Sequence, residues 1–249
     1  MLRHTLIFLE YELRNSLRNP AWALFGILQP LTYLLLFAPL VANTTAGGGM
    51  ADTLLAFTPG IMVMIALFGS LLVGFTMIAE MRDGYLERLA VSPARRPAIV
   101  LGRTLRDVLV LVVQALLVAA MAVVLGMRPS LPGLAVMLLL MAATGLLASG
   151  LSYGMALALR DEASMSAITQ FFALPLILLT GIMLPISLAP DWMRAVATVN
   201  PLYHSVEAGR ALFAGDFGAP AIPVAFAFTL ILGLLTLAWS VSSIRKTAF

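Results

Sequence analysis

Six long apolar runs restrict what this chain of 249 residues can fold into. A helix of roughly 20 apolar residues crosses a bilayer core about 30 Å thick, and each run has that length: Ala21–Val41, Leu54–Ile78, Val108–Met127, Leu131–Leu159, Ala163–Leu184 and Ile222–Ile244. Only 11% of the residues are charged, against about 25% in soluble domains, so too little polar sequence remains to cover such helices in water. We therefore expect an all-α integral membrane protein whose residues 1–249 form one transmembrane domain of six spans.

The distribution of basic residues predicts the orientation of these spans. Lys and Arg near span ends remain on the cytoplasmic side of a membrane. With the N-terminus inside, only three of the fifteen basic residues fall outside: Arg128, Arg194 and Arg210. The other twelve fall inside, so we expect both termini to be cytoplasmic. Arginine greatly exceeds lysine, which together with abundant Ala and Gly favours a bacterial source and a multi-pass protein of the bacterial inner membrane.

Residues 1–19 have the pattern of a helix that lies along the inner membrane surface. The apolar positions recur at three- and four-residue spacing: Leu6, Leu9, Leu13 and Leu17. The charged positions occupy another face: Glu10, Arg14 and Arg18. The acids within this polar start, and the length of the run that follows it, favour a retained span over a cleaved signal peptide.

The most charged stretch, residues 80–96, joins the second and third predicted spans. We expect Glu80–Leu89 to form a short helix that the Ser92-Pro93 pair ends. Its acids share one face: Glu80, Asp83 and Glu87. Another face carries Met81, Tyr85 and Leu89, with Leu86 beside them. A generic connector whose arginines only obey the positive-inside rule is the alternative, but it does not account for the acidic stripe and the aromatic residue.

Two stretches of the sequence resemble a known family. ERLAVSPARRPAIVLGR in the charged loop, and NPLYHSVEAGR at Asn200–Arg210, are similar to ABC transporter permeases of the type-2 exporter family, which contains daunorubicin-type drug exporters and polysaccharide exporters. The six-span layout, the amphipathic start and the chain length agree with that family. The resemblance implies that residues 80–96 form a coupling helix on a separate ATPase subunit, through Glu80, Asp83, Tyr85, Glu87, Arg88 and Leu89.

Residues 185–220, before the last span, are too polar to cross a membrane. Asp191 begins one predicted short helix, and the Asn200-Pro201 pair ends it. A second helix is expected over Leu202–Phe213, in which Glu207 and Arg210 are spaced to pair. The resemblance implies external re-entrant helices that help to close the exit, with Asn200, Pro201, Tyr203, Glu207 and Arg210 as site residues. An ordinary external loop is the alternative.

Several kinds of catalysis are excluded or disfavoured by the sequence. The chain has no cysteine, and its one lysine, Lys246, lies outside any G-x-x-x-x-G-K-[ST] motif that could hold ATP phosphates. We expect no cofactor or metal bound by this chain, and ATP and Mg in a partner ATPase. Gly150–Gly154 matches G-x-S-x-G, but inside an apolar run, where small residues four apart favour close helix packing over a hydrolase site.

The function that these features predict is the transmembrane subunit of an ATP-driven exporter. Its expected partners are ABC ATPase subunits, a second permease copy or homologue, membrane lipids and a hydrophobic or amphipathic drug or lipid-like substrate, with no nucleic acid. An ion-coupled transporter or channel is the alternative, and an intramembrane hydrolase is a third class. The nearly uncharged spans argue against ion coupling; Asp107 is an exception, and we expect it to pair with Arg103 at i, i+4.

Overall fold

The computed structural model describes residues 2–18, 28–36, 39, 49–84, 96–182, 186 and 189–246, and these residues form helices and no strand. The helices are α1 (Leu2–Arg18), α3 (Met50–Leu71), α4 (Val73–Arg82), α6 (Arg96–Val124), α7 (Leu131–Leu159), α8 (Glu162–Leu178), α9 (Asp191–Ala197), α10 (Pro201–Ala214) and α11 (Ala221–Lys246). Residues 28–36 are also helical. The predicted all-α class is confirmed for this part of the chain.

Four helical segments of the described residues are long and apolar enough to cross a membrane: Met50–Arg82, which comprises α3 and α4, Pro97–Val124, Leu131–Leu159 and Ala221–Ile244. They overlap the second, third, fourth and sixth predicted runs. The fifth is shorter than predicted, because α8 ends at Leu178 and the chain then turns. Of the first predicted run, Ala21–Val41, the structure describes residues 28–36 and 39, which are helical, and the rest falls outside the described residues.

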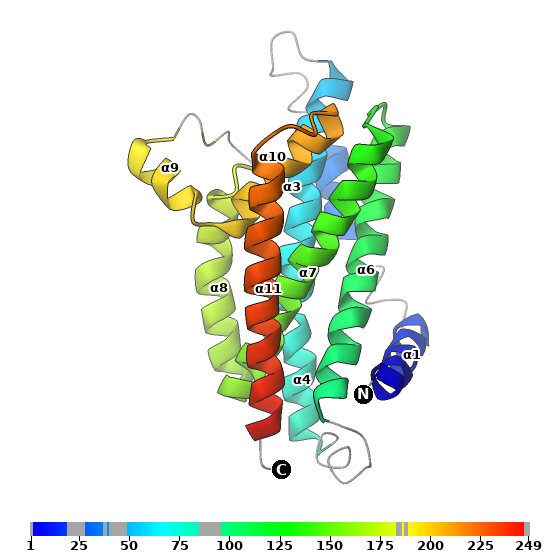
Figure 1. Ribbon diagram of the computed structural model, residues 1–249, viewed down its shortest axis with the longest axis vertical. Coiled ribbons are helices and arrows are strands. Elements are labelled where there is room, and N and C mark those ends of the chain that lie inside the picture. Colours follow the sequence, from blue (N-terminus) through cyan, green and yellow to red (C-terminus); the bar gives the residue numbers. More distant parts are fainter. Residues whose placement is uncertain are drawn as a thin grey trace.

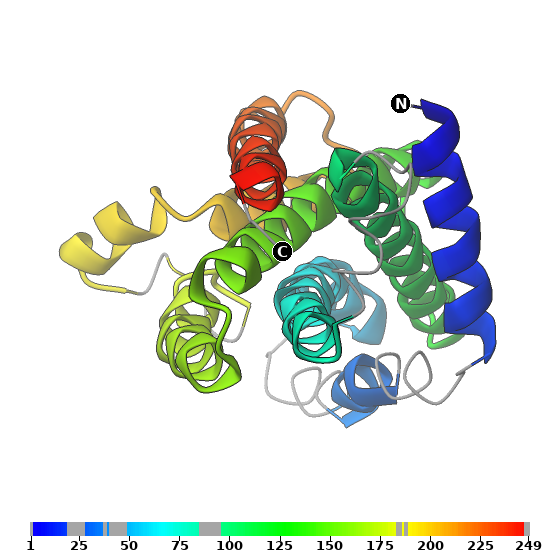
Figure 2. The ribbon, with the colours of Figure 1, turned by 90° about the horizontal axis from the view of Figure 1, so that it is seen from below.

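The long helices stand side by side, whereas α1 lies across them at the lower end of the molecule in Figure 1. We call this end the α1 end and the opposite end, where α10 lies, the α10 end. The last turn of α11 is also at the α1 end (Figure 1). Seen from below, α7 lies between α11 on one side and α3 and α4 on the other (Figure 2). Helix α1 runs alongside α6 in the same view. Helix α7 contacts α3, α4, α6, α8, α10 and α11, so it is the centre of the bundle.

Glycines in α7 allow α11 to approach closely. A Cβ atom at Gly150 would lie 2.8 Å from the Thr236 hydroxyl of α11, and one at Gly154 would lie 2.3 Å from the ring of Trp239. At Gly150 the main-chain nitrogen of Leu237 would also lie only 2.9 Å away, so α11 would have to move, and at Gly154 the ring of Trp239 would have to shift. The predicted role of these two glycines in helix packing is therefore confirmed.

A break at Leu72 separates α3 from α4 within one span. The Ser152 hydroxyl of α7 donates to the carbonyl of Leu71 at 2.7 Å and accepts from the amide of Gly74 at 2.9 Å. Unpaired main-chain groups are costly in a bilayer core, so this hydroxyl lets the helix be interrupted there. Gly74 is needed because a Cβ atom would lie 2.6 Å from the carbonyl of Ser152.

Candidate functional site

The two ends of the charged loop lie at the α1 end of the bundle (Figure 1). The structure differs from the prediction where the helix Glu80–Leu89 was expected to begin. Residues 80–82 are the last turn of α4, and Gly84 then adopts a left-handed φ of 67° that ends this helix. Asp83 is exposed at this turn. The other predicted coupling residues, Tyr85, Glu87, Arg88 and Leu89, lie outside the described residues. The structure therefore describes the base of the loop, where α4 ends and α6 begins.

Arg103 of α6 is buried at this base, with 3% of its side chain exposed, and it bridges two acids from other helices. Its Nε lies 3.0 Å from Oε1 of Glu12 in α1, and its Nη2 donates to Glu80 of α4. Nη1 points to the sulfur of Met77 at 3.3 Å. The prediction that Arg103 pairs with Asp107 is wrong, because the guanidinium of Arg103 turns toward acids of α1 and α4 instead. We call Glu12, Arg103 and Glu80 the α1–α4–α6 bridge.

Asp107, one turn further along α6, connects this region to α7. Its Oδ1 lies 2.8 Å from Nε of Arg106, and its Oδ2 accepts a hydrogen bond of 2.5 Å from the hydroxyl of Tyr153. Tyr153 belongs to α7 and is fully buried. Buried charges are stable only when paired and hydrogen-bonded, and here the paired carboxylate joins α6 to the central helix.

Helix α1 contributes to the site through the face that the sequence pattern left unassigned. Phe8 and Glu12 are one turn apart, and a Cβ atom at Gly102 of α6 would lie only 2.7 Å from Cβ of Phe8. The predicted polar face carries the exposed pair Glu10 and Arg14, 2.9 Å apart, while the side chain of Arg18 is outside the described part. Glu12 was not predicted as a site residue from the sequence. Its i, i+4 spacing from Phe8, which puts both residues on one face of α1, is a signal that could have indicated it.

The α10 end contains the two short helices that were predicted before the last span. Asn200 caps α10 by accepting from the amide of Leu202 at 3.0 Å, and Pro201 occupies its first turn. The predicted pair of Glu207 and Arg210 is present, with Nη1 and Oε1 2.5 Å apart. Tyr203 is partly buried in the same helix.

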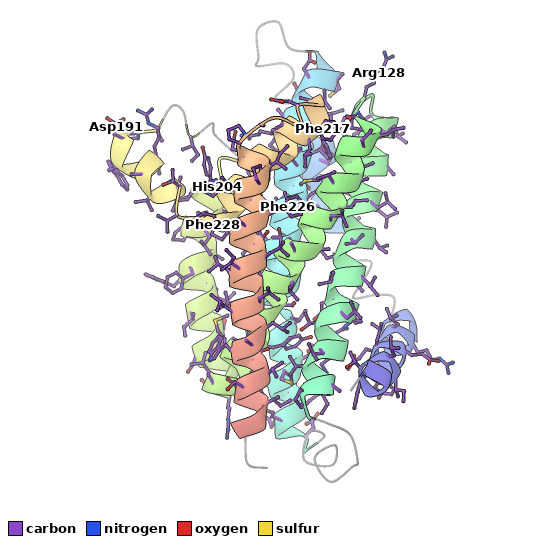
Figure 3. All side chains as sticks on the ribbon, viewed as in Figure 1. Arg128, Asp191, His204, Phe217, Phe226 and Phe228 are labelled. Carbon is purple, nitrogen blue, oxygen red and sulfur yellow. The ribbon has the colours of Figure 1, made fainter. Side chains whose placement is uncertain are left out.

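The side chains labelled in Figure 3 show what gathers at the α10 end. Arg128, Asp191 and His204 lie there, away from α1 (Figure 3). His204 bonds to the carbonyl of Thr198 at 2.8 Å, far from the buried Ser152 hydroxyl, which two main-chain groups already occupy. The G-x-S-x-G match therefore describes helix packing and not a nucleophile activated by this histidine.

Comparison with known proteins agrees with this architecture. Residues 3–214 match the ABC-2 type transporter family. The daunorubicin resistance ABC transporter permease protein DrrB1 of Streptomyces coeruleorubidus is 26% identical over 198 residues, which are 77% of this chain and 68% of that protein. A second relative, named "Probable multidrug ABC transporter permease YbhR" in Escherichia coli K12, is 26% identical over 161 residues, covering 64% of this chain and 43% of its own length. The family match covers most of the chain, and the structure has four candidate spans. The chain therefore belongs to the ABC-2 type transporter family.

Proposed function

We propose that this chain is the transmembrane subunit of an ATP-driven exporter, and that two copies, or this chain and a homologue, form the translocation pathway above two ATPase subunits. The family match supports a permease role, and the sequence has no P-loop of its own. ATP and Mg would therefore be bound by the partner subunits. In this proposal the chain has six spans with both termini in the cytoplasm, so that the α1 end faces the ATPases.

The observation that carries this proposal is the α1–α4–α6 bridge at the base of the charged loop. Arg103 joins α1 to α4 and α6 through buried ionic contacts, and nearby Asp107 joins α6 to α7. A force applied to the loop by an ATPase subunit would move these segments together, because separating them would leave buried charges unpaired. A generic connector has no need of such a base.

The break at Leu72 gives this movement a place to bend. Helix α4 carries Glu80 at the α1 end, and α3 continues toward the α10 end (Figure 1). Since Ser152 pairs the main-chain groups on both sides of the break, α4 can tilt relative to α3 without leaving them unpaired in the bilayer. We propose that this is how a push at the loop reaches the pathway.

The cargo in this proposal is a hydrophobic or amphipathic drug or lipid-like molecule. Two relatives carry names that refer to daunorubicin resistance and multidrug transport. Large apolar side chains are exposed along α6, α8 and α11, which suits contact with lipid, a second copy or an apolar cargo. These features support an apolar substrate class and a membrane location, which we propose to be the bacterial inner membrane.

The experiment that tests the coupling role is co-purification of the chain with the tagged ATPase encoded beside it. We expect Glu87→Arg to reduce retention of the ATPase and to abolish substrate-stimulated ATP hydrolysis, because it reverses a predicted contact charge. The matched control is Asp216→Arg, a reversal of an exposed acid between α10 and α11, which should leave both unchanged. Unchanged retention and hydrolysis in Glu87→Arg would exclude the coupling role.

Asp107 favours a second candidate function, an ion-coupled transporter. It is buried within the candidate span Pro97–Val124, and ionisable groups at membrane depth often serve ion pathways. In that case transport would continue after ATP depletion and stop when the proton gradient is dissipated, and Asp107→Asn would abolish it. The exporter proposal expects the reverse, namely loss of transport on ATP depletion alone.

A further inference from the structure

Arg210 of α10 carries hydrogen bonds in three directions. Its Nη1 donates to Oε1 of Glu207 in its own helix at 2.5 Å. Its Nε donates to the carbonyl of Ala56 in α3 at 3.1 Å, and its Nη2 donates to the carbonyl of Gly181, just past α8, at 2.8 Å. One guanidinium therefore connects three segments that are far apart in the sequence.

Both carbonyls lie where regular helical hydrogen bonding is interrupted or has ended. Ala56 is in the turn of α3 before Pro59. Proline has no N–H and therefore removes the helical hydrogen bond to the carbonyl of Leu55, next to Ala56, so regular helical bonding is interrupted in this turn. Gly181 lies in the turn that follows α8, with a left-handed φ of 73°, so its carbonyl is outside the helical hydrogen-bond pattern. The planar fork of arginine can supply several donors at fixed angles, which a lysine cannot.

Two further contacts draw the same segments together. The Asn200 side chain donates to the carbonyl of Leu176 in α8 at 3.0 Å. A Cβ atom at Gly60 of α3 would lie 3.0 Å from side-chain atoms of Ile182, the residue after Gly181. The α10 end of α3, the end of α8 and α10 thus form one closed cluster, in which Arg210 makes the connections from α10 to both α3 and the end of α8.

We infer that Arg210 is the latch of the external exit, a positioning residue that holds α3 and the end of α8 together and must release them before cargo leaves. This inference rests on the proposed function and orientation, which put the α10 end outside. Separating α3 from the end of α8 breaks at least one of the bonds to Ala56 and Gly181, because one guanidinium cannot follow both segments.

The surroundings of Arg210 lower the free energy needed to break its bonds to the two carbonyls. A quarter of its side chain is exposed, so water can replace the two carbonyl bonds. Glu207 is on the same helix and stays beside the guanidinium, so release leaves no unpaired buried charge. Arg103 differs in both respects, since it is 3% exposed and its acids are on other helices, and it is suited to a permanent connection.

Labelling of a single introduced cysteine tests the latch directly. The chain has no cysteine of its own. Thr58, two residues from Ala56, is fully buried, and its hydroxyl has no hydrogen-bond partner within the part of the chain that the structure describes, so Thr58→Cys sacrifices no bond seen there. In intact cells carrying Thr58→Cys, we expect Arg210→Gln to increase the rate of modification by a membrane-impermeant maleimide about tenfold, the order expected from losing charge-assisted hydrogen bonds.

The matched control is Arg194→Gln in the same Thr58→Cys chain. Arg194 lies at the same end and also pairs with an acid at i, i+3, Asp191, but that pair is within α9 alone. The Arg194→Gln chain should be modified at the rate of the parental Thr58→Cys chain. Arg210→Lys keeps the charge without the planar guanidinium, so its modification rate should be intermediate. Equal labelling of all four chains would overturn the latch, and Arg210→Lys decides the matter if Arg210→Gln does not fold.

A reversible cross-link tests whether release belongs to the transport cycle. The Cβ position of Gly60 is 3.3 Å from Cβ of Ile182, close to the spacing of about 3.8 Å in disulfides. In proteoliposomes with the ATPase, the oxidised Gly60→Cys/Ile182→Cys chain should lose transport and regain it on reduction. Full transport while oxidised would overturn the inference. Absence of ATP-driven transport in the reduced and the parental chains would instead count against the proposed function, and the labelling result would stand on its own.

Discussion

At the scale of single residues, burial decides what each arginine of this chain does. Arg103 and Glu12 are almost fully buried, with 3% and 8% of their side chains exposed. Removing one partner of a buried ion pair leaves an uncompensated charge, which costs about 3–5 kcal/mol. The exposed pair of Arg14 and Glu10 has no such penalty, since surface pairs contribute about 0–1 kcal/mol.

We therefore expect Arg103→Met to lower the thermal unfolding midpoint of the detergent-purified protein clearly, because it leaves Glu12 and Glu80 without their cation. Arg14→Met should leave the midpoint almost unchanged. Adding Glu12→Gln to Arg103→Met should recover part of the loss, since it removes the more deeply buried negative charge. A midpoint that falls equally in Arg14→Met and Arg103→Met would contradict this assignment.

The sequence predicted the local ion pair and not the distant ones. Glu207 and Arg210 are neighbours on one helix turn, so spacing alone indicates their contact. The partners of Arg103 come from α1 and α4, and no local pattern reports which helix will lie beside α6. For the same reason Arg210 was predicted to pair with Glu207, while its bonds to the Ala56 and Gly181 carbonyls were missed.

At the scale of elements, the break between α3 and α4 depends on a residue of another helix. The Ser152 hydroxyl serves both the Leu71 carbonyl and the Gly74 amide. Ser149 is equally buried in α7, but its hydroxyl only donates to the carbonyl of Gly145 one turn earlier. Such back-bonding competes with the helix and adds little stability.

Ser152→Ala should destabilise the protein by about 1–3 kcal/mol, the cost of leaving buried main-chain groups unpaired. Ser149→Ala is the matched change in the same helix and should have a much smaller effect. Thermal unfolding of both variants in the same detergent measures the difference. Equal midpoints would show that the hydroxyl of Ser152 does not support the break.

The start of α8 gives a dependence on pH. Oδ2 of Asp161 accepts from the amide and the hydroxyl of Ser164 at 2.8 and 2.6 Å, and these bonds lower the pKa of Asp161. A lowered pKa in the folded state means that the stabilisation is present at neutral pH and is lost as the pH falls below the unfolded value of about 3.9.

The expected result is that Asp161→Ala destabilises the protein more at neutral pH than at about pH 3. Asp161→Asn keeps a capping oxygen but has no titrating group. The difference in unfolding midpoint between Asp161→Asn and Asp161→Ala should therefore be the same at neutral and acidic pH. Unfolding midpoints measured across this range check the sign. A penalty for Asp161→Ala that grows on acidification would contradict the role of the carboxylate.

Helix positions were predictable to the extent that composition determines them. The cores of α7 and α11 agree with their predicted runs because a membrane demands an apolar segment of fixed length. The beginning of α6 at Arg96, well before the predicted span at Val108, was missed because this part of the helix carries Arg103, a charged residue whose partners come from other helices. The break at Leu72 was missed because the stabilising hydroxyl belongs to α7.

At the scale of the whole molecule, the two ends are built differently. The α1 end is held by buried ionic contacts between helices, whereas the α10 end is held by partly exposed hydrogen bonds to main-chain carbonyls. A bundle with one permanent and one releasable end can pass a movement along its length and open at the releasable end. The proposed orientation puts the permanent end in the cytoplasm.

This orientation predicts opposite labelling of the two ends. In intact cells, a membrane-impermeant maleimide should modify Asp216→Cys, an exposed position between α10 and α11. It should modify Arg14→Cys, exposed on α1, only after the inner membrane is permeabilised. Neither substitution removes a buried contact. Modification of Arg14→Cys in intact cells, with protection of Asp216→Cys, would reverse the topology.

The ionic contact between Glu12 and Arg103 also has a consequence for biosynthesis. The ribosome completes α1 long before it reaches α6, so Glu12 has to wait while α3, α4 and the charged loop are made and inserted. In the proposed orientation, α1 lies at the membrane surface during that interval, where its carboxylate can stay hydrated. Docking of this first helix onto α6 is thus possible only after the segments that contain α3, α4 and α6 have been made.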